Sequence, residues 1–230
     1  MNPFQELFDR QKRYFATGVT RSREWRIDQL DRMGRLIAEN EAALQQAIGR
    51  DFKTASQEQI FETRACFGET FFQKSQLDEW MKPTEAPVPK ALAATGHRGV
   101  VYRDPYGVAL VIGPFNGPLL LLLRPAITAL AAGNCCVLKL SMALEATTSL
   151  LMELVPEYFE PEAVVAVAGH REETTELLKL PFDFIFFTGS TSTGKVVARA
   201  ATENLTRFCR GRALGVYDSN KMRIAYVASE

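Results

Sequence analysis

The sequence contains little histidine and cysteine, with two histidines and four cysteines among 230 residues. The four thiols are Cys66, Cys135, Cys136 and Cys209, and their positions fit neither a disulfide framework nor the paired spacing of a zinc site. We therefore expect no disulfide, no metal centre, and a reducing, cytoplasmic location.

An excess of charge of either sign is also missing, because 27 Lys and Arg balance 27 Asp and Glu. No segment mixes basic and aromatic residues as nucleic-acid binders do, so we predict no nucleic-acid partner. The most apolar stretch, residues 118–132, contains Arg124 and is too short for a transmembrane segment. Residues 1–13 are charged and amphipathic, which argues against a secretory signal.

Residues 1–82 have the pattern of amphipathic helices. Residues 56–59 resemble a capping box ahead of a long helix over 60–80. The phenylalanines of that helix are expected to pack in the core, and they are Phe61, Phe67, Phe71 and Phe72. Three prolines then predict an extended connector over residues 83–103.

From residue 104 the pattern changes to short apolar runs that alternate with helix-like segments. Strands are expected at residues 108–112, 135–140, 164–169 and 184–187, and helices at 119–132, 145–158, 172–179 and 195–204. This alternation predicts an α/β fold with a parallel sheet that carries helices on both faces. Ligands of such sheets bind beyond the carboxyl ends of the strands.

A glycine-rich turn, Thr-Gly-Ser-Thr-Ser-Thr-Gly-Lys at residues 188–195, follows the last predicted strand. A strand that leads through such a turn into a helix presents backbone N–H groups to one point, which favours a phosphate. Two other interpretations stay open. The turn matches most of a Walker A loop, although Val196 stands where that loop needs Ser or Thr for Mg²⁺, and glycine turns also occur without a ligand.

Five motifs along the chain together resemble the aldehyde dehydrogenase superfamily, and mostly its class 3 branch. They are Asp-Pro-Tyr-Gly-Val at 104–108, Ile-Gly-Pro-Phe-Asn-Gly-Pro at 112–118, Ala-Leu-Ala-Ala-Gly-Asn at 129–134, Val-Leu-Lys at 137–139 and Phe-Thr-Gly-Ser-Thr at 187–191. The resemblance implies N-terminal helices over 1–82, an oligomerisation hairpin over 83–103, and an incomplete Rossmann-like NAD(P)-binding domain over 104–206. It also implies a homodimer.

Members of the family oxidise aldehydes to carboxylic acids with NAD or NADP, and the resemblance implies roles for individual residues. Asn116 matches an asparagine that stabilises the oxyanion formed on addition to the carbonyl. Lys139 matches a lysine near the adenosine ribose, and Gly169 a glycine near the adenine. The other matches to cofactor-binding positions are Ser141, Gly189, Ser190, Thr191, Ser192, Thr193 and Gly194.

Several of these positions depart from the family pattern. Met142 replaces a carboxylate that accepts hydrogen bonds from the ribose, which puts the affinity for NAD in question. Gly117 loosens the turn beside Asn116, and Thr193 places a hydroxyl where the family commonly has Val or Ile.

After residue 206 the resemblance stops, and residues 207–230 form a tail that does not match the family. The glutamate that serves as general base is missing, as is the Gly-Gln-x-Cys region that supplies the nucleophile. We therefore predict a truncated, catalytically inactive copy. Residues 224–227 of the tail have the pattern of a short replacement strand. The alternatives are a non-catalytic dinucleotide-binding or subunit-association module, and a degenerate P-loop NTPase.

Overall fold

The computed structural model describes residues 2–211 and confirms the predicted α/β class. Five parallel strands form its central sheet in the order β5-β4-β3-β6-β7. The strands are β3 (Val108–Ile112), β4 (Cys135–Lys139), β5 (Val164–Val167), β6 (Phe184–Thr188) and β7 (Arg207–Gly211). β3 is the first of these strands in the chain and lies in the centre of the sheet. The next two strands, β4 and β5, lie on one side of it, and β6 and β7 lie on the other. The winding therefore reverses between β3 and β6, where α/β sheets bind ligands.

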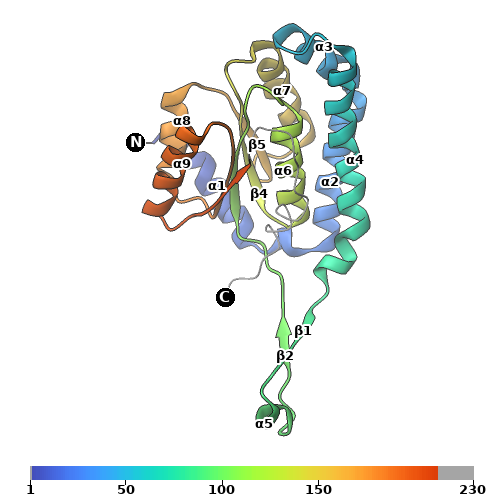
Figure 1. Cartoon of the computed structure of the whole chain (residues 1–230), viewed down its shortest axis with the longest axis vertical. Coiled ribbons are helices and arrows are strands. Elements are labelled where there is room, and N and C mark those ends of the chain that lie inside the picture. The colour runs from blue at the N-terminus through green and yellow to red at the C-terminus, as the bar shows by residue number, and fades with distance from the viewer. Residues whose placement is uncertain (1, 212–230) are drawn as a thin grey trace.

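Helices cover both faces of this sheet (Figure 1). One face carries α1 (Gln5–Ala16), α8 (Arg171–Leu178) and α9 (Thr191–Glu203), and the opposite face carries α6 (Leu120–Ala131) and α7 (Glu145–Tyr158). Outside α6 and α7 lie α2 (Arg23–Glu39), α3 (Glu41–Asp51) and α4 (Ser56–Met81), and a short 3-10 turn (Val19–Arg21) joins α1 to α2. No helix within residues 2–211 has both the length and the apolarity that a membrane crossing requires.

The central strand β3 is buried on both faces. Ala109 and Val111 join the apolar core beneath α6 and α7, whereas Val108 and Leu110 join the core beneath α1, α8 and α9. Successive side chains of a strand point to opposite faces, so an unbroken apolar run is what a doubly covered strand needs.

The long helix α4 differs from the sequence prediction at its start. It begins at Ser56, four residues before the predicted helix, and residues 56–59 form its first turn. The N-cap residue is Ala55, which has no capping side chain, so the predicted capping box is wrong.

The predicted burial of the α4 phenylalanines is wrong for three of the four. Phe61, Phe71 and Phe72 are 61%, 53% and 50% exposed, and Phe67 packs partly against the core. The buried face of α4 is instead largely polar, with Glu62, Thr63, Cys66, Glu69, Thr70, Gln73 and Leu77. Hydrogen bonds to α6 occupy this face, because Glu69 accepts from Arg124 and Gln73 donates to Thr128 Oγ1.

Residues 83–103 form an arm that projects from the rest of the chain (Figure 1). β1 (Thr84–Ala86) pairs antiparallel with β2 (Gly99–Val101), and the short helix α5 (Lys90–Ala93) lies at the tip. The extended connector expected from the prolines is therefore a hairpin, and its contact with a second subunit stays a prediction.

The sequence did not predict β7, since the last strand expected from the sequence is at residues 184–187. The strand pairs in parallel with β6 from Arg207 opposite Phe184 to Gly211 opposite Thr188. Two arginines interrupt its sequence, Arg-Phe-Cys-Arg-Gly, so it lacks the apolar run that marked the other strands. The sheet thus extends into the segment that was assigned to an unmatched tail, and the predicted strand at 224–227 lies outside the described residues.

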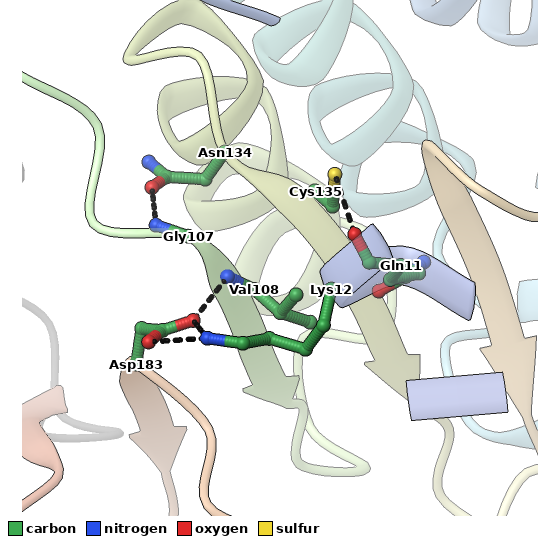
Figure 2. A network of polar contacts seen from close by, with 7 residues as sticks. All are labelled: Gln11, Lys12, Gly107, Val108, Asn134, Cys135 and Asp183. Atoms are coloured by element: carbon green, nitrogen blue, oxygen red, sulfur yellow. Dashed lines mark hydrogen bonds and ion pairs between the residues drawn. The ribbon is translucent and has the colours of Figure 1, made fainter. Parts of the chain in front are cut away.

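A polar network holds the amino ends of the strands, opposite the end where ligands are expected (Figure 2). Asp183, just before β6, accepts the N–H of Val108 at 2.7 Å and pairs with Lys12 of α1 at 2.9 and 3.0 Å. Beside it, the Gly107 N–H donates to Asn134 Oδ1 at 3.0 Å. The network therefore fixes the starts of β3 and β6, the two strands between which the winding reverses.

Candidate functional site

Two adjoining cavities lie at the carboxyl ends of the strands, and together we call them the switch-point cleft. The first has a volume of about 690 Å³ and lies between the turn after β3 and the turn after β6. The second, of about 580 Å³, extends over the ends of β4 and β5. Both are lined by Gly113, Ser141, Phe187 and Thr193, so the two cavities are neighbours across the reversal point.

The sequence-predicted site residues gather in this cleft, with one exception. The first cavity is lined by Asn116, Ser141, Gly189, Ser190, Thr191 and Thr193. The second is lined by Lys139, Ser141, Gly169, Ser192 and Thr193. Gly194 lines neither cavity but is buried under Arg210, whose Cδ would lie 3.0 Å from a Cβ at position 194. The absence of a side chain at Gly194 therefore leaves space for Arg210, and the residue does not face the cleft.

The β6–α9 turn is shorter than the glycine motif suggested. Only Gly189 and Ser190 connect the two elements, because α9 begins at Thr191 and not at Lys195. Ser190 is the N-cap residue, and its hydroxyl accepts the N–H of Thr193 at 3.2 Å. Since residues 191–194 are the first turn of a helix, they cannot form the wrapping loop of a Walker A motif, and that interpretation is wrong.

The first turn of α9 faces the cleft with hydroxyl-bearing residues. Thr191 and Thr193 line the first cavity, and Ser192 lines the second. First-turn N–H groups have no partner within their own helix and carry the positive end of the helix dipole. This end of the cleft is therefore suited to a phosphate.

Two glycines of the cleft have structural reasons for lacking a side chain. A Cβ at Gly189 would lie 2.5 Å from the Phe187 ring. Gly169 has a φ of +141°, and a Cβ there would lie 2.5 Å from Cβ of Glu173. Glycine is therefore needed at both positions for packing within the protein, and both residues also line the cleft.

Lys139 is buried at the end of β4, with 4% of its surface exposed. Its Nζ donates to the carbonyl oxygens of Leu140 and Gly169, both at 2.6 Å. Burial lowers the pKa of this ammonium, and the nearby Glu173 carboxylate opposes that shift. An ammonium has three N–H donors, so one is left for a ligand hydroxyl or phosphate in the second cavity.

Asn116 lies on the turn between β3 and α6, in the same cavity as Gly189 and Ser190. Its neighbour Phe115 is 50% exposed and makes an edge-to-face contact with Phe52, with ring centroids 5.7 Å apart. The topology thus brings together residues more than 70 positions apart, as expected for strand ends that flank a reversal point.

Sequence reasoning missed two polar residues of the first cavity, Thr188 and Arg210. Arg210 comes from β7, and its Nη2 donates to Thr191 Oγ1 at 2.8 Å. The sequence offered no signal for Arg210, because the strand that carries it was not predicted.

No cysteine is found among the described residues that line the cleft. Cys66, Cys135 and Cys136 are buried, and Cys209 is partly exposed on β7. Burial raises the pKa of Cys135 to about 12 and raises the pKa of Cys66 and Cys136 still further above the ordinary value. Because thiolates are the reactive form, these three thiols are poor nucleophiles.

We therefore expect three of the four thiols to stay unmodified in the folded chain. Titration with 5,5′-dithiobis(2-nitrobenzoate) at pH 8 should modify only Cys209 within minutes, and all four should react in guanidinium chloride. The Cys209→Ser variant is the control, and it should show no fast reaction. Rapid modification of two or more thiols in the native protein would contradict this assignment.

Comparisons with known proteins show which family the chain matches. Residues 7–210 match the model of the aldehyde dehydrogenase family. The chain is 38% identical to aldehyde dehydrogenase family 3 member B1 of Homo sapiens over 207 residues, which cover 90% of this chain and 44% of that protein. It is 37% identical to family 3 member A2 of Macaca fascicularis over 198 residues, covering 86% of this chain and 40% of the relative.

A solved structure described as the substrate-bound state of Staphylococcus aureus AldH superposes with a TM-score of 0.88 at 30% identity. The match covers 92% of this chain and 46% of that one. The chain thus spans about half the length of the relatives that it matches. The family match includes most of β7, so the prediction that the resemblance ends at residue 206 is wrong.

Proposed function

Because the chain belongs to the aldehyde dehydrogenase family, we propose that its switch-point cleft binds NAD or NADP. The observation that carries this proposal is the meeting of three features in one cleft: the Asn116 turn, the N-terminus of α9 and the Lys139 ammonium. A dinucleotide needs an anion site between two sites for its nucleosides, and the two cavities offer that order.

The residues of the cleft suit the parts of such a ligand. Lys139 would hold the adenosine ribose, with Ser141 and Gly169 beside it, and the first turn of α9 would hold the diphosphate. The buried hydroxyl of Thr188 has no hydrogen-bond partner within residues 2–211, so a polar group in the first cavity would satisfy it. Met142 lines the second cavity and offers no carboxylate to a ribose hydroxyl, which leaves the preference between NAD and NADP to experiment.

For the complete enzyme we propose oxidation of aldehydes to carboxylic acids. The nicotinamide ring would supply the hydride acceptor when bound. Asn116 would direct its side-chain N–H₂ at the oxyanion that forms when a nucleophile adds to the carbonyl, and one such donor in a dry site is worth about 3 kcal/mol. The present chain holds neither the cysteine nucleophile nor the glutamate base, so we propose that it does not turn over aldehydes by itself.

Titration calorimetry with NADH and NADPH, in buffer without metal, tests the proposal. We expect saturable binding of at least one dinucleotide. The Lys139→Met variant should bind it about tenfold more weakly, because a hydrogen bond from a charged donor is lost. Thermal melting of the variant checks that the loss of affinity does not come from unfolding.

Lys195→Met is the matched control, since Lys195 is exposed on α9 and does not line the cleft. Its affinity should stay within about twofold of the parent chain. An aldehyde such as benzaldehyde, added with NAD, should produce no NADH. Failure of the parent chain to bind either dinucleotide would overturn the proposed function, and turnover of the aldehyde would overturn the proposed inactivity.

A further inference from the structure

Two buried polar atoms without hydrogen-bond partners among residues 2–211 belong to the same cavity. They are Oγ1 of Thr188, a residue that is 2% exposed, and Nε of Arg210. Both residues line the first cavity of the switch-point cleft. Six other buried side-chain atoms among the described residues also lack a hydrogen-bond partner, but of the eight residues only Thr188 and Arg210 line this cavity. A polar ligand there would satisfy the Thr188 hydroxyl.

Arg210 lies against the first turn of α9. Its Nη2 donates to Thr191 Oγ1 at 2.8 Å, and its Nε would lie 3.1 Å from a Cβ at position 194. The guanidinium therefore crosses the N-terminal end of the helix, where the dipole is also positive. A cation in that position is unfavourable unless an anion lies between the two positive groups.

The cleft itself offers no such anion. The described residues that line its two cavities include no Asp or Glu, whereas Lys139, Arg171 and Arg210 line it. A ligand with one or more negative charges is therefore the missing counterpart. NAD and NADP both carry a diphosphate, and it would lie between the cavity of Lys139 and that of Asn116.

We propose that Arg210, with the Thr188 hydroxyl and the N-terminus of α9, forms the subsite for the diphosphate of the cofactor. This inference rests on the proposed function, and it adds a binding residue that comes from β7. Nη2 of Arg210 holds Thr191, and the other NH₂ group of the planar guanidinium is the donor that we assign to the phosphate oxygens.

Calorimetric titration of the whole chain with NADH, ADP and adenosine tests the role of Arg210. The Arg210→Met variant should bind NADH and ADP about tenfold more weakly, while its affinity for adenosine, which has no phosphate, should stay within about twofold. Arg210→Lys should lie between Met and Arg for ADP, because it keeps the charge without the fork. The loss of ADP affinity should shrink at high salt, since the interaction is ionic.

Arg199→Met is the matched control, because Arg199 is exposed on α9 and does not line the cleft. It should bind all three ligands as the parent chain does. If Arg210→Met binds ADP and NADH as tightly as the parent chain, or loses adenosine affinity to the same extent, the assignment of Arg210 is overturned while dinucleotide binding stands. If the parent chain binds no dinucleotide, both the proposed function and the assignment of Arg210 are overturned.

Discussion

Replacing Glu62 with leucine is expected to lower the free energy of unfolding by about 3–5 kcal/mol. Glu62 is completely buried on α4, and its Oε2 accepts the N–H groups of Leu119 and Leu120 at 2.9 and 3.1 Å. Its Oε1 lies 2.6 Å from Nζ of Lys53. Leucine would leave a mostly buried ammonium and two backbone donors without partners, and the start of α6 without a cap.

Urea unfolding followed by circular dichroism measures this loss, with Glu58→Leu as the control on the exposed face of the same helix. The control should change the stability by no more than about 0.5 kcal/mol. Adding Lys53→Met to Glu62→Leu removes the orphaned charge, so the double variant should be more stable than the sum of the two single changes predicts. A loss below about 0.5 kcal/mol for Glu62→Leu would show that the buried pair has no net effect.

The same contact shows which features of the fold the sequence could not predict. The N-cap residues of α6 and α7 are Leu119 and Leu144, and neither has a side chain that can cap. Glu62 caps α6 from 57 residues away, and Asp51 caps α7 from 95 residues away, accepting the N–H of Ala146 at 2.8 Å. Such partners are chosen by tertiary packing, so no local sequence signal identifies them.

Burial on α4 was mispredicted for a related reason. The sequence indicated the helix correctly, but hydrophobicity placed its phenylalanines inside. The structure instead buries Glu62, Glu69 and Gln73, whose partners lie on or beside α6. Burying polar side chains is tolerated when hydrogen bonds or ion pairs compensate the lost hydration, and those partners are visible only in three dimensions.

The site was more predictable than these packing details. The alternation of strands and helices along the chain allows few topologies. In all of them the carboxyl ends of the strands beside the reversal point lie close together, whichever side chains they carry. Asn116 and Ser190 therefore share a cavity as expected. Arg210 could not be predicted, because β7, which pairs only with β6 among residues 2–211, does not have the apolar run of the other strands.

The second large effect is expected for Gly107→Ala, which should lower the free energy of unfolding by about 3 kcal/mol. Gly107 has a φ of +141°, where residues with a side chain are strained. A Cβ at this position would also overlap Oδ2 of Asp183, the oxygen that accepts the Val108 N–H at 2.7 Å (Figure 2). Alanine would thus combine backbone strain with the loss of a bond that fixes the starts of β3 and β6.

Gly18→Ala separates these two causes, because Gly18 has a φ of +79° but no atom within 4 Å of its would-be Cβ. Alanine there should remove only about 1 kcal/mol, the strain of a left-handed backbone. An Asp183→Ala background removes the two nearest atoms and leaves only the Cβ of residue 183, at 3.2 Å, so Gly107→Ala should cause a smaller further loss than it does alone. Equal losses for Gly107→Ala in the two backgrounds would show that the backbone, and not Asp183, makes glycine necessary. Gly107→Ala disturbs β3 and β6, the two strands that flank the reversal point. We therefore expect this variant also to bind NADH more weakly in the switch-point cleft, at the opposite end of the sheet.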